Sequence, residues 1–122
     1  MRRVLVVDDE LDICLILSRH LQAHQFETRY ALTVKDARLK IGISTFALMF
    51  IDLNLTDGSG YDVISYTQEL NLNPKIIVIS AHDSEEAKAL DRGAALFIKK
   101  PFTIKSIDEA LEKLYSSPNS SN

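Results

Sequence analysis

Acidic, hydroxyl and basic side chains follow four apolar runs of this 122-residue sequence at the point where each run ends. Continuous apolar runs of this kind are typical of parallel strands that are covered on both faces. The residues that come directly after them are Asp8, Asp9, Asp52, Ser80, Lys99 and Lys100. Because ligands of open α/β sheets bind outside the carboxyl ends of the strands, we expect three carboxylates, a hydroxyl and an ammonium group to meet there.

Three carboxylates in close proximity favour a bound cation, because their mutual repulsion otherwise raises some of their pKa values. Mg²⁺ fits this set, since it prefers oxygen ligands and keeps several waters beside one or two carboxylates. Zinc is disfavoured at this edge, where no Cys/His cluster accompanies the acids. A carboxylate such as Asp52 can also act as a nucleophile toward a phosphoryl group. Lys100 and the metal would then balance its charge, and Ser80 would donate a hydrogen bond to it.

Each of these residues also has an ordinary structural interpretation. Aspartates at strand ends are common loop residues and helix caps, and Ser80 could cap the helix that follows it. Lys99 is expected to be a solvated side chain rather than part of the cluster. Four such sites at a single edge are harder to explain as loop residues than any one of them alone.

The elements that must position these residues alternate regularly along the chain. Strands are expected over 4–7, 27–30, 47–51, 76–79 and 96–98, and helices over 10–24, 34–41, 59–70, 84–92 and 103–115. This alternation predicts an α/β fold of the (βα)₅ kind, a doubly wound parallel five-stranded sheet. Right-handed crossovers favour the flavodoxin-like strand order 2-1-3-4-5, and the polar second strand fits an edge.

Helix ends and faces give finer predictions. Thr33 and Ser84 are expected to cap the second and fourth helices, and Gly93 to stop the fourth. In the first helix, the predicted buried stripe comprises Ile13, Ile16, Leu17 and Leu21.

Length and composition indicate one domain, expected over residues 1–115, followed by a polar tail or linker stub over 116–122. The net charge of −3 gives no sign of nucleic-acid binding by this domain. The single cysteine, Cys14, cannot form an internal disulfide. No apolar stretch approaches the roughly 20 residues that span a bilayer, so we expect no membrane partner and a cytoplasmic protein.

Five segments together resemble the receiver domains of bacterial two-component response regulators. They are VVDDE at 6–10, DLNLTDGSG at 52–60, ISA at 79–81, GA at 93–94 and KPF at 100–102. Their order and spacing cover residues 3 to about 115. The Asp-Asp pair, the single Asp and the Lys-Pro pair are specific in combination, whereas each alone is a weak signal.

The resemblance implies a role for each matching residue. Asp52 is implied as the phosphoacceptor, and Asp9, Asp52 and the carbonyl of Asn54 as direct Mg²⁺ ligands, with Asp8 acting through metal-bound water. Lys100 is implied as the cation that pairs with the phosphoryl group, and its bond to Pro101 is expected to be cis. The implied switch pair is Ser80 and Phe97.

The sequence also departs from the family at two positions. Thr56 replaces a frequent proline, which predicts a less rigid loop, and Phe97 replaces the commoner tyrosine, so its inward position must depend on packing. Asn54 and His82 occupy the variable positions that are expected to set how fast the acyl phosphate hydrolyses.

The function implied by the resemblance is a signalling switch rather than an enzyme. A sensor histidine kinase or histidine phosphotransfer protein would supply the phosphoryl group, and the surface of the fourth helix, fifth strand and fifth helix would change for an output partner or an effector domain. Dimerisation on phosphorylation fits the same resemblance. The cognate kinase and the output pathway stay open.

Three other functions compete with this one. An aspartate-nucleophile phosphatase needs a second Asp two residues after the nucleophile, where this chain has Asn54. A flavin-binding domain needs a phosphate-cradling loop after the first strand, where this chain is acidic. A receiver-like module without phosphorylation is disfavoured by intact Asp9, Asp52 and Lys100.

Four further expectations concern individual side chains. His20 and His24 are spaced i and i+4, but no third metal ligand is evident, so a surface or packing role is favoured. Leu11 and Leu15 lie opposite the predicted buried stripe, where they would either pack on the fifth helix or join Pro101 and Phe102 in a docking patch. Lys100 is expected to be a mobile cation over a hydrated cleft, and Asp57 to face solvent.

Overall fold

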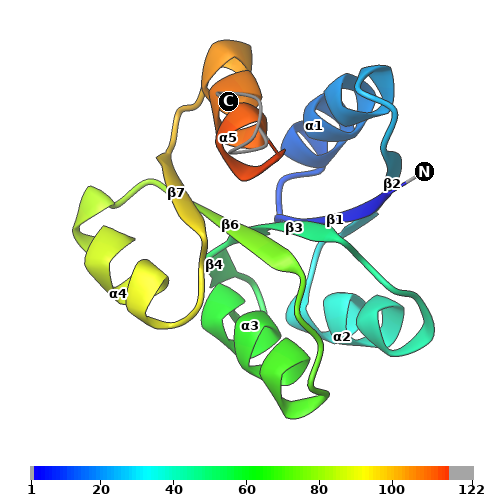
Figure 1. Cartoon of the computed structure of the whole chain (residues 1–122). Coiled ribbons are helices and arrows are strands. Elements are labelled where there is room, and N and C mark those ends of the chain that lie inside the picture. Colours follow the sequence, from blue (N-terminus) through cyan, green and yellow to red (C-terminus); the bar gives the residue numbers. More distant parts are fainter. Residues whose placement is uncertain (1, 116–122) are drawn as a thin grey trace, which may run out of the picture.

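The computed structural model describes residues 2–115 and contains a five-stranded parallel sheet (Figure 1). Its strands are β1 (Arg3–Val7), β2 (Glu27–Ala31), β3 (Leu48–Asp52), β6 (Lys75–Ser80) and β7 (Leu96–Lys99). They lie in the order β2-β1-β3-β6-β7, which is 2-1-3-4-5 when only the strands of this sheet are counted. The predicted fold class and strand order are therefore confirmed.

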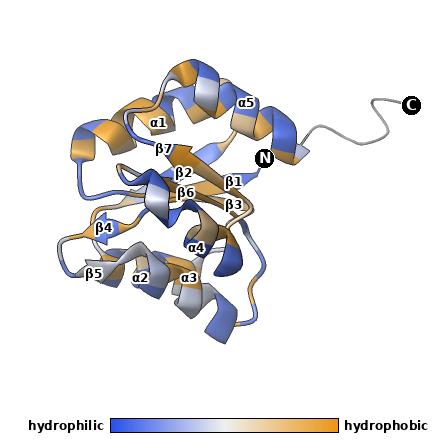
Figure 2. Ribbon diagram, turned by 90° about the vertical axis from the view of Figure 1, so that its left-hand side faces the viewer, coloured by the Kyte–Doolittle hydropathy of each residue, from blue (hydrophilic) through white to orange (hydrophobic). Residues whose placement is uncertain are grey.

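Within residues 2–115, five α-helices cover the two faces of the sheet. They are α1 (Leu11–Ala23), α2 (Val34–Ile43), α3 (Gly60–Glu69), α4 (Glu86–Asp91) and α5 (Ile104–Tyr115). Helices α1 and α5 lie on one face, and α2, α3 and α4 lie on the other (Figure 1). Figure 2 shows the same layering edge-on, with helices of mixed hydropathy on either side of the strands.

Each face of the sheet has its own buried apolar cluster. The cluster under α1 and α5 includes Leu17, Phe50 and Ile107, and the cluster under α2, α3 and α4 includes Val63, Ile64 and Ala89. Alternate residues of the central strands supply both clusters, because successive side chains of a strand point to opposite faces. The continuous apolar sequence of β1, β3 and β6 follows from this double burial.

The buried face of α1 differs from the predicted stripe. Cys14, Leu17, Ser18 and Leu21 are buried, whereas Ile16 is 54% exposed. These four positions follow the i, i+3, i+4, i+7 spacing of one helical face. The small side chains of Cys14 and Ser18 therefore face the core, whereas the larger and more apolar Ile16 lies off this face. The prediction for Ile16 was wrong.

Helix ends follow the sequence signals in part. The Thr33 hydroxyl accepts a hydrogen bond from Asp36 N at 3.0 Å, and Gly93 has a φ of +115° after α4, as expected. The Ser84 cap was wrong, because Ser84 lies inside a 3₁₀ turn, η1 (Asp83–Glu85), and α4 begins only at Glu86. A capping box at the start of α3, formed by Ser59 and Asp62, was not predicted.

A short hairpin that the sequence did not predict follows Asp52. Strands β4 (Asn54–Leu55) and β5 (Gly58–Ser59) pair antiparallel, and between them Asp57 caps the N-terminus of α2. Its carboxylate accepts hydrogen bonds from Val34 N at 2.7 Å and Lys35 N at 3.0 Å, which lower the pKa of Asp57. Asp57 is exposed as expected, and its hydrogen bonds tie the β4–β5 loop to α2. The less rigid loop predicted from Thr56 stays a prediction.

The described part of the chain, residues 2–115, contains no helix that is long and apolar enough to cross a membrane. The predicted tail over 116–122 lies outside the described residues. The last described element, α5, ends at Tyr115.

Candidate functional site

The predicted site residues meet at the carboxyl edge of the sheet. Asp52 is the last residue of β3 and Ser80 the last of β6, while Asp8 and Lys100 directly follow β1 and β7. Parallel pairing of these four strands aligns their ends, with Asp52 beside Ile79 in the register. As a result, the nearest carboxylate oxygens of Asp8, Asp9 and Asp52 all lie within 4.8 Å of one another.

Lys100 is the cation of this cluster. Its Nζ lies 2.9 Å from Asp8 Oδ2 and 3.5 Å from Asp52 Oδ2. Its backbone N–H also donates to Ser80 O at 2.8 Å, which fixes the start of the loop after β7. The lysine side chain is only 16% exposed, so the expectation of a mobile cation in a hydrated cleft was wrong. Burial lowers the pKa of Lys100, but the ion pairs with Asp8 and Asp52 outweigh it and raise the pKa overall.

Asp52 is held in an environment that disfavours its charge. Burial is the main cause, and the nearby negative charge of Asp8 adds to it, so that the pKa of Asp52 rises from 3.8 to about 6. Lys100 and a hydrogen bond from the Asn54 backbone act in the opposite direction. The charged form of Asp52 is therefore less favourable in the fold than in water, so ionisation of Asp52 lowers the stability of the folded protein.

This raised pKa predicts that Asp52→Asn stabilises the metal-free protein. When the pKa of a carboxyl group is higher in the folded state than in the unfolded state, the protein loses stability as the pH rises through the folded-state pKa, here about 6. At about 1.4 kcal/mol per pKa unit, we expect the variant to gain about 1 to 3 kcal/mol of unfolding free energy above pH 7. The gain should shrink as the pH falls from about 6 to about 4. Urea denaturation with EDTA across this pH range measures it, and a gain independent of pH would contradict it.

The acid cluster has the chemistry of a divalent cation site. Asp8 Oδ2 is buried and makes an ion pair with Lys100, but among the described residues it has no hydrogen-bond donor of good geometry. Asp9 is exposed, which leaves the cluster open to solvent on one side. Three carboxylates with one open side fit Mg²⁺, which uses few protein oxygens and keeps several waters.

The remaining predicted residues lie on β4, β6 and β7 or in the loops that follow β6 and β7. Asn54 is exposed at the start of β4. It lines a hollow on the surface together with Ser80 and His82. The buried Ser80 hydroxyl accepts a hydrogen bond from His82 N at 3.1 Å. Phe97 is half-buried and packs against the core under α2, α3 and α4. The Lys100–Pro101 peptide bond is cis, as expected. The exposed Lys99 side chain lies outside the acid cluster, with its Nζ 3.5 Å from Asp83 Oδ2.

Two contacts near the cluster were not predicted. The Cys14 thiol donates to the Asp8 carbonyl oxygen at 3.4 Å, and burial raises the pKa of Cys14 to about 12. Tyr61 donates to Glu85 Oε1 at 2.9 Å and so links α3 to the turn before α4. The available signal for the first contact was the i+3 and i+7 spacing from Cys14 to Leu17 and Leu21, which places Cys14 on the buried face of α1. The second depends on the geometry of two loops that carry no pattern in the sequence.

Gly60 places α3 directly against the Asp52 backbone. A Cβ atom at this position would lie 2.7 Å from Ile51 Cγ2 and would also clash with the Asp52 carbonyl oxygen. The Gly60 N–H donates to Leu53 O at 3.0 Å, which closes the hairpin behind the acid cluster. Only glycine permits this approach.

The sequence profile of the response regulator receiver domain matches residues 4–112. This chain belongs to that family. Two similar proteins are the response regulator PilR of Pseudomonas aeruginosa, 34% identical over 88% of this chain and 25% of its own length, and the sensory transduction protein LytR of Staphylococcus epidermidis, 31% identical over 92% and 45%. This receiver domain therefore spans between a quarter and about half of these relatives.

Solved receiver domains have the same fold. The response regulator TrrA of Thermotoga maritima, in complex with Mg²⁺ and BeF, has a TM-score of 0.83 and 27% identity over 93% of this chain and 99% of its own. The HemR receiver domain of Leptospira biflexa has a TM-score of 0.86 and 27% identity, covering 96% of each chain. The resemblance stated from the sequence is thus confirmed at the level of the family.

Lys100→Ala is expected to destabilise this receiver domain without metal. Removing the ammonium group leaves Asp8, which is 2% exposed, and the neighbouring Asp52 without their cation. Loss of one partner of a buried ion pair destabilises proteins by about 3 kcal/mol or more, and Mg²⁺ should restore part of this by supplying positive charge. Thermal unfolding with EDTA and with MgCl₂ measures both effects. Equal melting temperatures for wild type and variant in EDTA would show that Lys100 is not a structural partner of the acids.

Proposed function

We propose that this receiver domain is a phosphorylation switch in which Asp52 accepts a phosphoryl group in a Mg²⁺-dependent reaction. The observation that carries the proposal is the position of Asp52, a buried carboxylate at a strand end beside Asp8, Asp9 and Lys100. The donor would be a phosphohistidine on a sensor histidine kinase or a histidine phosphotransfer protein.

In the proposed transfer, an Asp52 carboxylate oxygen forms a bond to phosphorus while the phosphorus–nitrogen bond of the phosphohistidine breaks. The electron pair of the broken bond stays on the imidazole nitrogen, and the ring leaves as neutral imidazole after it takes up one proton from solvent. Asp9, Asp52 and the Asn54 carbonyl would hold Mg²⁺, with Asp8 acting through water, and the ion would neutralise charge on the phosphoryl oxygens. Lys100 lies within 3.5 Å of the attacking carboxylate, which supports its role as the second cation.

The switch would begin at Ser80. Its oxygen accepts a hydrogen bond from His82 N, so its own hydroxyl hydrogen is available to donate to a phosphoryl oxygen. Movement of Ser80 would open space for the half-buried Phe97 to turn inward and would alter the surface formed by α4, β7 and α5. This is a two-state element biased by a local change of charge.

As a phosphorylation switch, the domain would have no substrate other than itself and its phosphoryl donor. It catalyses only its own phosphorylation and dephosphorylation, and the exposed Asn54 occupies the place of a phosphatase acid. We expect it to act in the cytoplasm, without binding nucleic acid directly, and to signal through an output partner or an effector domain, with dimerisation on phosphorylation. The effector is a proposal drawn from relatives that are longer than this chain.

Acetyl phosphate, a small-molecule phosphoryl donor, tests the proposal without knowledge of the kinase. Incubation with acetyl phosphate and Mg²⁺ should add one phosphoryl group per chain, measured by intact-mass spectrometry. Omission of Mg²⁺ or addition of EDTA should prevent it. No incorporation under conditions that label an established receiver domain would contradict the proposed function.

Leu15→Ser tests docking of the phosphohistidine partner. Leu11 and Leu15 are each 43% exposed on α1, and Pro101 is exposed at the same end of the domain as the acids. A docking patch that contains Leu11, Leu15 and Pro101 would provide binding energy without adding charge near the phosphoryl group. If Leu15 anchors the docking interface, we expect transfer from the cognate phosphohistidine protein to slow by about tenfold, which corresponds to a loss of about 1.4 kcal/mol.

Two readouts separate docking from folding in this variant. Labelling by acetyl phosphate should keep the wild-type rate, because a small donor does not use the patch. The melting temperature should change little, since Leu15 is not part of the buried face of α1. Unchanged transfer from the protein donor would refute the docking role, and a large fall in melting temperature would assign Leu15 to the core.

A further inference from the structure

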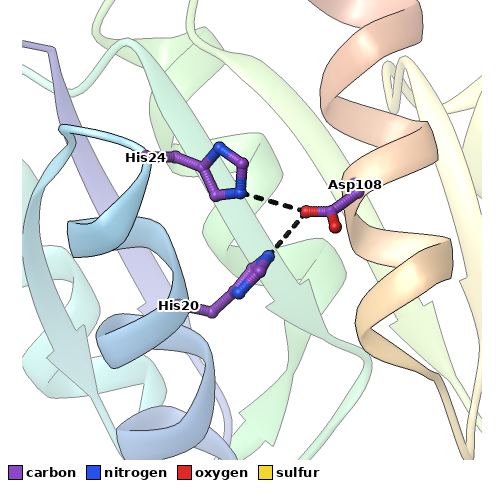
Figure 3. A group of neighbouring side chains, drawn as sticks. All are labelled: His20, His24 and Asp108. Atoms are coloured by element: carbon purple, nitrogen blue, oxygen red, sulfur yellow. Dashed lines mark hydrogen bonds and ion pairs between the residues drawn. The ribbon is translucent and has the colours of Figure 1, made fainter.

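His20, His24 and Asp108 form a second cluster of ligand-type side chains, between α1 and α5 (Figure 3). His20 Nε2 lies 2.6 Å and His24 Nε2 lies 3.2 Å from the same atom, Asp108 Oδ1. The two rings are 4.7 Å apart and edge to face, and both turn toward the carboxylate (Figure 3). The third partner that the histidine pair lacks in the sequence is thus supplied by α5.

The geometry is close to that of a transition-metal site. Histidines at i and i+4 share one side of a helix, and two imidazole nitrogens with one carboxylate oxygen form a ligand set suited to Zn²⁺. With metal–ligand bonds of about 2.0 to 2.2 Å, tetrahedral ligand atoms lie about 3.3 Å apart. The His24 contact of 3.2 Å already matches this spacing, and the His20 contact of 2.6 Å has to lengthen by less than about 1 Å.

The surroundings leave room for that adjustment and for an open coordination position. His24 and Asp108 are each 45% exposed, whereas His20 is 20% exposed and held against the domain. Both exposed residues line a groove together with Glu112, which lies one helical turn after Asp108 and offers a further carboxylate. Arg2 lines the same groove, but its guanidinium is stacked 4.4 Å from the Tyr115 ring centroid.

We propose that His20, His24 and Asp108 bind a divalent transition ion, with Zn²⁺ as the best-fitting member, and that the ion joins α1 to α5. Water or Glu112 would complete the tetrahedron. Each Nε2 has to be unprotonated to bind, so a ring that carries its proton on Nε2 passes that proton to its own Nδ1 or to solvent when the ion binds. The site is separate from the acid cluster and uses none of its residues.

The experiment uses a background that removes the other cation site. In the double variant Asp9→Asn and Asp52→Asn, circular dichroism follows thermal unfolding with and without ZnCl₂. We expect Zn²⁺ to raise the melting temperature by about 4 °C or more at saturating concentration. Co²⁺ should give the intense visible absorption of tetrahedral nitrogen and oxygen coordination, which an octahedral site does not show.

The third histidine of the chain provides a matched control. His82 is exposed in the loop after β6, so adding His82→Gln to the background should leave the Zn²⁺ effect unchanged. Adding His24→Gln or Asp108→Asn, both at half-exposed positions, should weaken Zn²⁺ binding by at least about tenfold. Loss of the effect with His82→Gln, retention with His24→Gln or Asp108→Asn, or no effect of Zn²⁺ on the background would each overturn the proposal.

Discussion

Replacing Asp52 with asparagine is expected to abolish phosphoryl incorporation from acetyl phosphate. The amide has the shape of the carboxylate but is a far weaker nucleophile, so the bond to phosphorus does not form. Asp52 is 5% exposed and the substitution adds no volume, which means that the fold should persist. Intact-mass spectrometry after incubation with acetyl phosphate and Mg²⁺ measures the loss, which should be complete against one phosphoryl group per chain in wild type.

Asp57→Asn is the matched control for this loss. Asp57 is the nearest acid in the same loop, but its carboxylate accepts hydrogen bonds from two backbone N–H groups of α2. We expect the Asp57 variant to be labelled as wild type is, with some loss of stability from the weakened helix cap. Stoichiometric labelling of the Asp52 variant, or selective loss of labelling in the Asp57 variant, would show that the phosphoryl group is attached to a residue other than Asp52.

The variant Asp9→Ala is expected to lose most of its affinity for Mg²⁺. Asp9 is the exposed member of the acid cluster, and Asp8 is buried and paired with Lys100. We expect more than about a 100-fold loss of affinity for Asp9→Ala and about a 10- to 100-fold loss for Asp8→Ala, since groups that act through bound water contribute less than direct ligands. Isothermal titration with MgCl₂ measures both, and equal affinity of wild type and Asp9→Ala would remove the proposed metal site.

Stability without metal distinguishes the same two variants. Asp9→Ala lowers the repulsion within the cluster, so its melting temperature in EDTA should equal or exceed that of wild type. Asp8→Ala also removes the partner that lies 2.9 Å from Lys100 Nζ, and the melting temperature should fall. A fall for both variants would show that Asp9 has a structural contact beyond the cluster.

The fold and the composition of the acid cluster could be predicted because both depend on local patterns. Apolar runs of strand length mark the sheet, and the residue after each run is fixed at its carboxyl edge by the parallel pairing. Asp8, Asp52 and Ser80 could therefore be placed together before any distance was known.

Features that depend on packing could not be predicted in this way. The pairing of β4 with β5 involves two residues on each side, too few for an alternation pattern. Asp108 meets His20, from which it is 88 residues apart in the sequence, because α1 and α5 lie side by side on one face of the sheet. The burial of Lys100 results from its position between Asp8 and Asp52, whereas a lysine in a loop sequence indicates a solvated side chain.

The ion pair between Asp8 and Lys100 has a consequence for the charge balance of the cluster. With the three carboxylates ionised, the single ammonium group leaves a charge of −2, which one divalent cation neutralises and a monovalent ion does not. Conversion of Asp52 to an acyl phosphate dianion would add one further negative charge. The phosphorylated form would then depend on the divalent ion more than the unphosphorylated form does, and by thermodynamic linkage phosphorylation should tighten Mg²⁺ binding.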